Sequence, residues 1–334
     1  MSNAFFDFSA LKKKYRAAGS KALKKTGVHH LSQSSCGTLR ECTQQFYYKS
    51  ELRAAKPELS LGNIGHALVE RVCGLLTPAV DKYFGGEITS EELCTVFPEF
   101  RDAVLDKLDI SEEFMKCAAE EFDNLINSSV EMLFQGGPTD FRNKLMSLSE
   151  TMSKSITREL LARILEHPPV ACEIPVAYFP KGLTIPYMGY IDLLCITPSG
   201  MHISDLKFTF SNNQYVWNDP KTVFQLWLYS VSLLQMGIVD KMPGVSISRV
   251  TVDGPKRKVI PSMFKVTLER KSPPPLRENA RTFHAILHGT EHMITSGIEI
   301  FANSKYGCGS CDYKDRCQHV ESFGWIDLDK KDEG

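Results

Sequence analysis

Three absences narrow the function classes open to this chain of 334 residues. No apolar run reaches the ~18–20 residues that a membrane-spanning helix needs, so we expect no transmembrane segment. The first residues lack the basic, apolar and small-residue order of a signal peptide, which predicts an intracellular, cytoplasmic protein. The formal net charge is −1, so no overall excess of positive charge indicates a nucleic-acid partner.

Disulfide bonds are also expected to be absent, because cysteines of an intracellular protein stay reduced. The chain has ten cysteines. Five stand singly in apolar segments and are predicted to be small buried side chains: Cys73, Cys94, Cys117, Cys172 and Cys195. The other five gather towards the two ends of the chain: Cys36, Cys42, Cys308, Cys311 and Cys317.

Charge is unevenly placed along the sequence. Residues 12–25, KKKYRAAGSKALKK, form a basic run, whereas residues 111–124 are acidic. A basic run is most often a solvated face of a helix or loop. It can also be an arm beside a phosphate backbone, and both interpretations stay open at this point.

Hydrophobic periodicity predicts a helical first half and a strand-rich second half. Helical patterns occupy 32–52, 58–76 and most of 88–168. Five strands are expected at 171–179, 183–197, 201–210, 244–252 and 258–268. Further helices are expected at 219–237 and 275–298. This order predicts an α/β protein of the mixed α+β kind, with a central mixed sheet flanked by helices.

Two carboxylates and a lysine are predicted to meet within this sheet. Asp192 stands in the apolar strand GYIDLL, and Asp205 and Lys207 stand on the next strand, in ISDLKF. The turn PSG predicts a hairpin that places the two strands side by side. An Asp–Lys pair alone is an ordinary ion pair at a strand end. The second carboxylate favours a divalent metal site, because adjacent buried anions repel unless a cation lies between them.

The order of the polar residues resembles the PD-(D/E)XK nuclease superfamily, in its RecB-like branch. Asp192 matches the Asp of the first motif, and Asp205-Leu206-Lys207 matches the (D/E)-x-K. The remaining matches are His66 in GNIGHALVE, Glu173 in CEIPV, and Gln225 and Tyr229 in QLWLYS, which fits the Q-x3-Y helix.

The resemblance implies a restriction-endonuclease-like core and a DNA nuclease that depends on Mg2+ or Mn2+. The implied metal ligands are His66, Asp192, Asp205 and the backbone carbonyl of Leu206. Lys207 would position or activate the attacking water, and Glu173 would assist. Gln225 and Tyr229 would brace the strands of the site and touch the DNA backbone.

The spacing C-x2-C-x5-C of Cys308, Cys311 and Cys317 indicates a metal-type loop that requires a fourth ligand. This part resembles the Cas4, AddB and exonuclease V type proteins, in which one cysteine before the core and three after it hold a [4Fe-4S] cluster. Cys42, which precedes the segment FYY at 46–48, is the upstream match. Such a cluster would tie the two ends of the chain together.

Two alternatives to this ligand set stay open. Zinc suits four thiolates equally well, and three cysteines with either Cys42 or His319 would hold it. Cys36 lies six residues before Cys42 and is the poorer match by position.

The resemblance divides one interwoven nuclease domain into four parts. These are an N-terminal helical segment with Cys42 and His66 (1–84), a helical insertion (85–168), the nuclease core (169–300) and a C-terminal iron–sulfur clasp (301–334). The function it implies is an exonuclease for single-stranded DNA or DNA ends, in recombination, repair or phage DNA processing in a bacterial or phage-infected cell. Recombination or replication proteins are expected partners. The alternative is a non-catalytic DNA-binding subunit of a recombination or helicase complex.

Overall fold

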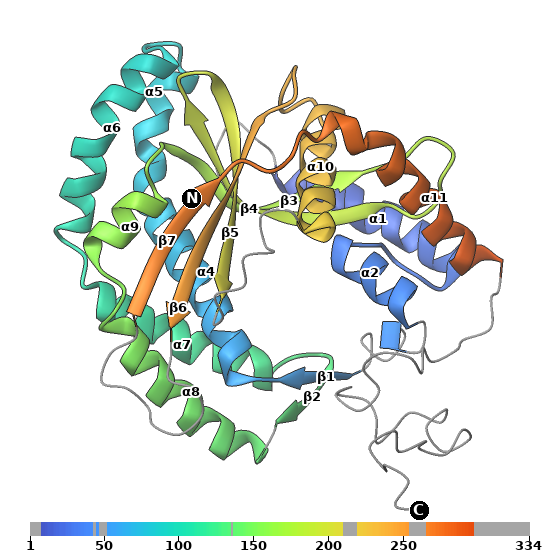
Figure 1. The fold of residues 1–334 in the computed structure, drawn as a ribbon, viewed down its shortest axis with the longest axis horizontal. Helices are drawn as coiled ribbons and strands as arrows, with labels where there is room; N and C mark the ends of the chain where they lie inside the picture. Colours follow the sequence, from blue (N-terminus) through green and yellow to red (C-terminus); the bar gives the residue numbers. More distant parts are fainter. Residues whose placement is uncertain are drawn as a thin grey trace, which may run out of the picture.

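A computed structural model describes residues 8–42, 45–46, 52–134, 136–209, 219–253 and 265–296. Its centre is a five-stranded mixed sheet with helices on both faces, which confirms the predicted fold class (Figure 1). The strand order is β3-β4-β5-β6-β7, and only the β5–β6 pair is parallel. The strands are β3 (Pro169–Tyr178), β4 (Tyr187–Thr197), β5 (Gly200–Thr209), β6 (Gly244–Asp253) and β7 (Lys265–Lys271).

The predicted hairpin is present, since Thr197 pairs with Gly200 across the turn between β4 and β5. β4 begins four residues later than predicted. The backbone amides of Thr184 and Ile185 donate to the carboxylate of Glu291 on α11 (Ala280–Thr295), at 2.7 and 3.0 Å. These two residues therefore belong to a loop held by a side chain rather than to the strand.

Each face of the sheet has its own apolar core. Leu193, Leu206 and Val250 pack on one face against α4 (Pro57–Leu76), α6 (Ser90–Leu105), α7 (Ile110–Ile126), α8 (Gly137–Ser153) and α9 (Arg158–Ile164). Ile174, Ile191 and Ile247 pack on the other against α2 (Gln33–Glu41), α10 (Pro220–Gln235) and α11. The functional strands are thus clamped between two helical layers (Figure 1).

Two predicted helices end earlier than expected. Cys42 has an extended backbone (φ −158°, ψ 110°) that ends α2, and β1 (Leu52–Ala55) begins at the last residue of the predicted helix. α7 ends at Ile126, and β2 (Glu131–Phe134) pairs in parallel with β1. Short apolar runs fit a helix and a strand equally well, and here a partner distant in sequence decides between them.

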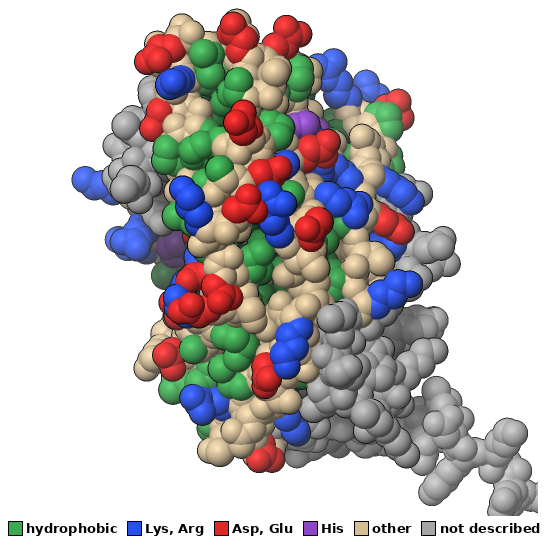
Figure 2. All heavy atoms as spheres, turned by 90° about the vertical axis from the view of Figure 1, so that its left-hand side faces the viewer, with side chains coloured by type: hydrophobic (Ala, Val, Ile, Leu, Met, Phe, Trp, Pro, Cys, Tyr) green, Lys and Arg blue, Asp and Glu red, His purple; other side chains and the backbone are tan. Residues whose placement is uncertain are grey.

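The remaining described elements are α1 (Phe8–Thr26), η1 (Thr77–Val80), α5 (Asp81–Phe84) and η3 (Arg277–Asn279). No helix in the described ranges is both long and apolar enough to cross a membrane. On the face formed by α6 and α9, acidic and basic side chains are interspersed (Figure 2).

Candidate active site

β4 and β5 separate at Asp192 and Asp205, the two carboxylates predicted from the sequence, so the sheet forks at this point. The β4–β5 ladder runs from Thr197–Gly200 to Leu193–Ser204 and stops there. Beyond that point β4 stays paired with β3, and β5 stays paired with β6. The first residues past the last pair are Asp192 and Asp205, one on each branch. We call the side chains gathered at this point the fork site: His66, Glu173, Asp192, Asp205 and Lys207.

The side chain of Asp192 accepts a backbone hydrogen bond from β5 that β4 no longer accepts beyond the fork. Its Oδ2 accepts a hydrogen bond of 2.6 Å from the N–H of Leu206, whose own pairing with β4 has ended. A buried backbone donor needs such an acceptor, so the fork itself explains why this carboxylate is held in place. The second oxygen, Oδ1, lies 3.8 Å from Nδ1 of His66.

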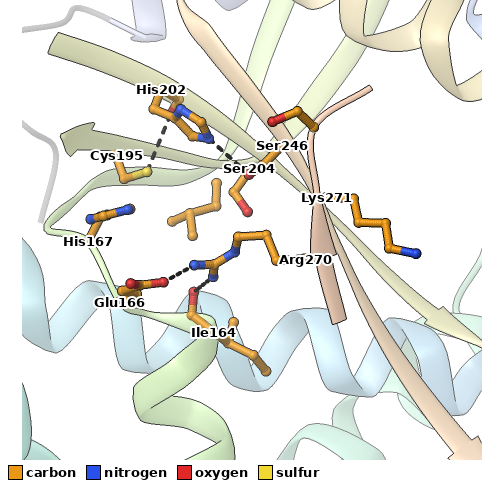
Figure 3. Close-up of a pocket in the computed structure, with 11 residues that line it drawn as sticks. Ile164, Glu166, His167, Cys195, His202, Ser204, Ser246, Arg270 and Lys271 are labelled. Carbon is orange, nitrogen blue, oxygen red and sulfur yellow. Dashed lines mark hydrogen bonds and ion pairs between the residues drawn. The ribbon is translucent and has the colours of Figure 1, made fainter. Parts of the chain in front are cut away.

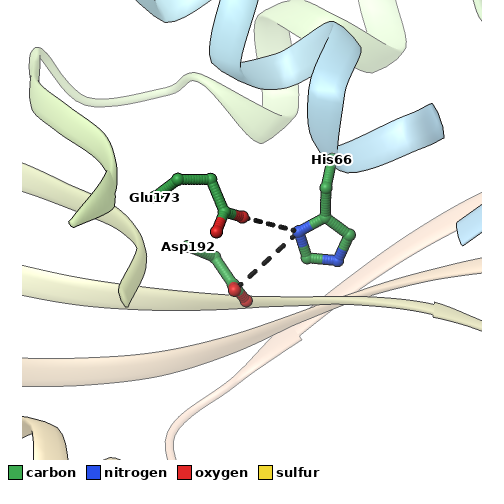
Figure 4. Close-up of side chains that lie close together, drawn as sticks. All are labelled: His66, Glu173 and Asp192. Carbon is green, nitrogen blue, oxygen red and sulfur yellow. Dashed lines mark ion pairs between the residues drawn. The ribbon is translucent and has the colours of Figure 1, made fainter. Parts of the chain in front are cut away.

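His66 and Glu173 complete a cluster around that free oxygen (Figure 4). Nδ1 of His66, on α4, lies 3.6 Å from Oε1 of Glu173, on β3. One ligand atom from each of His66, Glu173 and Asp192 lies within 4.8 Å of the others. Two carboxylates and one imidazole form a donor set that suits Mn2+ or Mg2+.

Local backbone features explain how these side chains converge. Cys172 pairs with Leu193 and Ile174 with Ile191, so Glu173 stands opposite Asp192. Glu173 also has a left-handed backbone, with a φ of 48°, which is unusual for a residue with a long side chain. Among the described residues other than glycine, this left-handed conformation occurs only at Glu173, which points its carboxylate into the cluster.

The helix side of the site depends on Gly65. A Cβ atom at this position would lie 2.5 Å from Cζ of Phe208, so only glycine allows α4 to approach β5 this closely. The Phe208 ring then contacts the His66 ring edge-on, with centroids 5.5 Å apart. This contact fixes the direction of the imidazole.

Asp205, Lys207, Gln225 and Tyr229 form a continuous chain of hydrogen bonds. Nζ of Lys207 lies 2.8 Å from Oδ1 of Asp205 and 3.3 Å from Oε1 of Gln225. Nε2 of Gln225 donates to the hydroxyl of Tyr229 at 2.6 Å. The Tyr229 ring packs on β4 at Gly189, where a Cβ atom would lie 2.7 Å from its Cε1. α10 thereby holds the lysine against the fork.

The charges of the fork site shift one another's pKa values. Burial raises the pKa of Asp205 to about 6, and the nearby Asp192 adds to this while Lys207 opposes it. Burial also raises the pKa of Asp192. For Lys207, burial lowers the pKa, but Asp205 and Asp192 outweigh it and raise the pKa above its ordinary value. Lys207 is therefore a cation at neutral pH, beside carboxylates that burial disfavours as anions.

One atom of this cluster lacks a partner. Oδ2 of Asp205 is buried and accepts no hydrogen bond within the described ranges, and the residue is 0% exposed. An orphaned carboxylate oxygen next to a converging imidazole and two further carboxylates fits a divalent cation, which would compensate the buried charge. The residues present therefore fit the metal that the sequence predicts.

The structure gathers His66, Glu173 and Asp192 into one ligand group, which does not include the predicted ligand Asp205. Asp205, Lys207, Gln225 and Tyr229 form the adjoining hydrogen-bonded chain. Glu173, expected only to assist, lies as close to the ligand cluster as His66 and Asp192 do. Leu206, predicted to act through its carbonyl, is fixed in the structure through its N–H. The fork and the left-handed backbone of Glu173 have no counterpart in the sequence pattern.

The cysteines are only partly placed. Cys42 is half-buried at the end of α2, and its Sγ accepts a hydrogen bond of 3.4 Å from the N–H of Gln45. Cys36 is buried and its thiol lies 3.4 Å from the hydroxyl of Tyr187, inside the core. The three C-terminal cysteines and His319 lie outside the described residues.

A second polar cluster, which shares no residue with the fork site, surrounds a cavity of about 220 Å³ (Figure 3). Arg270 on β7 donates to the hydroxyl of Ser248 at 2.9 Å and forms an ion pair with Glu166. It also donates to the carbonyls of Arg163 and Ile164, at 2.9 and 3.1 Å. We call this cluster the Arg270 brace, because it ties the end of α9 to the sheet.

Two histidines complete the Arg270 brace. Nε2 of His202 lies 2.9 Å from the hydroxyl of Ser246, and the His167 ring lies 6.4 Å from the His202 ring. Burial lowers the pKa of His202 to about 4, and His167 and Arg270 add to this. The two histidines are therefore uncharged at neutral pH, and the guanidinium of Arg270 binds a hydroxyl, a carboxylate and two carbonyls.

The chain is similar to one protein-family model and to several solved structures. The sequence model of the PD-(D/E)XK nuclease superfamily matches residues 30–318. No curated protein matches the chain. Similar solved structures include a "Putative exonuclease" from Eubacterium rectale, at 11% identity over 98% of both chains with a TM-score of 0.44. A second is SSO0001, at 13% identity over 63% of this chain and 82% of that chain, with a TM-score of 0.30.

Proposed function

The chain belongs to the PD-(D/E)XK nuclease superfamily, and from that premise we propose that it is a Mg2+- or Mn2+-dependent deoxyribonuclease acting as an exonuclease on single-stranded DNA or DNA ends. The observation that carries the proposal is the fork site. It combines converging acidic and imidazole ligands with a charged lysine held against a buried carboxylate.

Each side chain has a role that follows from its contacts. Asp192 Oδ1, Glu173, His66 and the free oxygen of Asp205 would hold one or two ions. A bound ion would polarise the phosphodiester and lower the pKa of the attacking water. Because Lys207 stays protonated, it would orient that water and stabilise the charge that develops on the phosphate, rather than accept a proton.

Gln225 and Tyr229 act through Lys207. The amide of Gln225 accepts from the lysine and donates to Tyr229, so it holds the ammonium group in one position. Positioning of this kind contributes to catalysis only if the surrounding packing is rigid. The Tyr229 ring, 7% exposed and packed on Gly189, supplies that rigidity.

We also propose the iron–sulfur branch of the superfamily for this chain. Cys42, Cys308, Cys311 and Cys317 would hold a [4Fe-4S] cluster, with zinc as the rival occupant. The position of Cys42 at the end of α2, half-buried and outside the core, supports its choice over Cys36. The absorption of anaerobically purified protein tests this, because a band near about 400 nm that Cys311→Ser removes requires a cluster. Colourless protein with one bound zinc would overturn it.

The helical insertion and the setting of the reaction follow as proposals from the same family. Residues 85–168 would restrict the site to strand ends by threading, which supports exonuclease action in recombination, repair or phage DNA processing. Recombination or replication proteins would be its partners.

Cleavage of end-labelled single-stranded DNA in Mn2+ tests the central proposal. We expect the wild type to shorten the strand from its end and Asp192→Asn to leave it intact while still binding it. A circular single strand should resist cleavage if the enzyme needs an end. A wild-type protein that binds DNA but leaves it intact would instead indicate the non-catalytic DNA-binding subunit.

A further inference from the structure

α1 concentrates positive charge in a chain that carries almost no net charge. The helix contains no acidic residue, although the whole chain has a net charge of −1. Six of its basic side chains are exposed: Lys13, Lys14, Arg16, Lys21, Lys24 and Lys25. This contrasts with the face formed by α6 and α9, where both signs are mixed (Figure 2).

The charges also share one side of the helix. At 3.6 residues per turn, the five lysines fall within about a third of the helix circumference. The opposite side carries the buried Tyr15, Gly19 and Ala22. A helix of this length spans roughly 28 Å, which is long enough to follow several successive phosphates of a nucleic-acid strand.

α1 is a fixed part of the nuclease fold rather than a free arm. It lies against β3, the strand that carries Glu173 (Figure 1). Tyr15 is 3% exposed and its hydroxyl lies 3.8 Å from Sδ of Met236, just after α10. Nζ of Lys14 lies 5.7 Å from the centre of the Phe179 ring, at the end of β3. The basic side is therefore held in a defined position relative to the sheet.

An exposed aromatic residue connects α1 to the fork. Tyr190 lies on β4 two residues before Asp192 and is 54% exposed, on the stretch of β4 that has separated from β5. It lies beside β3, the strand against which α1 packs, because Tyr190 pairs with Pro175 on that strand. An exposed ring beside a cationic surface is the arrangement that proteins use to stack on unpaired bases.

We propose that α1 and Tyr190 form the surface that holds a DNA strand beside the fork site, with the lysines on the phosphates and the Tyr190 ring on a base. This rests on the proposed deoxyribonuclease function, and it adds where the substrate lies outside the metal ligands. The strand would run from the carboxylates over Tyr190 and along the basic side of α1.

Binding of labelled single-stranded DNA to the full chain in EDTA tests the role of α1. For Lys21→Gln/Lys24→Gln/Lys25→Gln we expect Kd to rise by about an order of magnitude. The slope of log K against log salt should become shallower by about 2, since each lost phosphate contact removes about 0.7. The matched control is Lys82→Gln/Lys241→Gln/Lys265→Gln, which removes three exposed lysines from α5, from the segment after α10 and from β7, all outside the helical insertion.

Wild-type Kd and slope in the α1 variant, or an equal loss in the control, would overturn the role of α1. Tyr190→Leu should weaken single-stranded DNA binding about ten-fold and leave duplex binding unchanged, whereas Tyr190→Phe should bind like the wild type. An equal loss for duplex DNA, or no loss, would overturn the stacking role. Hydrolysis of bis(p-nitrophenyl) phosphate in Mn2+ should be unchanged in all four variants.

These assays can refute the DNA-binding surface and the deoxyribonuclease activity independently. If the wild type binds DNA with the expected α1 dependence but hydrolyses neither substrate, the deoxyribonuclease proposal is wrong and the surface stands. If the wild type cleaves DNA and the α1 variants bind it unchanged, the surface is wrong and the nuclease stands.

Discussion

Two polar clusters share the same sheet and differ in how completely their groups are paired. In the Arg270 brace, the arginine meets a hydroxyl, a carboxylate and two carbonyls. In the fork site, a fully buried oxygen of Asp205 has no partner within the described ranges, and neighbouring acids face one another. Complete pairing marks a structural element, whereas buried groups left without partners point to a ligand.

The difference starts in the strands. The Arg270 brace is built on β5, β6 and β7, which stay paired beyond the fork: Arg270 pairs with Ser248, and Ser248 pairs with Leu206, so its side chains only need to satisfy one another. The fork site sits where β4 leaves β5, so side chains must replace lost backbone partners. Four substitutions or titrations test this contrast, and they are ordered here from the largest expected effect to the smallest.

Asp205→Asn should separate activity from stability at the fork. We expect deoxyribonuclease activity in Mn2+ to fall by about 10³-fold or more, because a ligand oxygen and its charge are lost. The amide oxygen can still accept from Lys207, and Asp192 remains to compensate the ammonium group. Because burial already disfavours the charge of Asp205, the thermal midpoint in EDTA should stay or rise. A lower midpoint with retained activity would mean that Asp205 is only a structural ion-pair partner.

Arg270→Met in the Arg270 brace should lower stability and leave activity unchanged. Removing the guanidinium leaves two helix-end carbonyls without this donor and leaves Ser248 with Ser204 as its partner. We expect the free energy of unfolding to fall by about 2–4 kcal/mol, measured by chemical denaturation. The specific activity of the folded fraction should be unchanged. Loss of activity without loss of stability would show that the two clusters are coupled.

Gly189→Ala should disturb the fork indirectly. The new methyl group would lie 2.7 Å from Cε1 of Tyr229, so the ring must move and Gln225 must follow it. We expect a destabilisation of about 1–3 kcal/mol and a lower kcat with KM unchanged. Gly74→Ala on α4 is the control, since its methyl group meets no atom within 4 Å and should be neutral or stabilising. Equal effects at both positions would refute the bracing role of Tyr229.

Much of this contrast can be predicted from the sequence, but only where the pattern is local. Asp192, Asp205 and Lys207 stand out because charges interrupt apolar strands and a turn signal joins them. The pairing of β1 with β2 joins segments almost eighty residues apart, which periodicity does not record. The left-handed backbone of Glu173 and the four acceptors of Arg270 also depend on tertiary contacts. These contacts decide which charges belong to a site and which to the scaffold.

The pH dependence of stability should have opposite signs in the two clusters. His202 has a pKa of about 4 in the folded protein and about 6.5 when unfolded, so the unfolded chain binds more protons between these values. This histidine therefore lowers stability as the pH falls from 6.5 to 4. Asp205 has a raised pKa of about 6, so the folded protein binds the extra proton and gains stability as the pH falls through that value.

Thermal midpoints in EDTA between pH 7 and 4 separate the two contributions. His202→Gln, which can keep a hydrogen bond to Ser246, should make the loss of stability with acid shallower than in the wild type. Asp205→Asn should make it steeper, because the compensating protonation is gone. If the thermal midpoint falls with pH equally in both variants and the wild type, neither group titrates in this window. If the fall is steeper in His202→Gln and shallower in Asp205→Asn, the assignment of the paired and unpaired clusters is wrong.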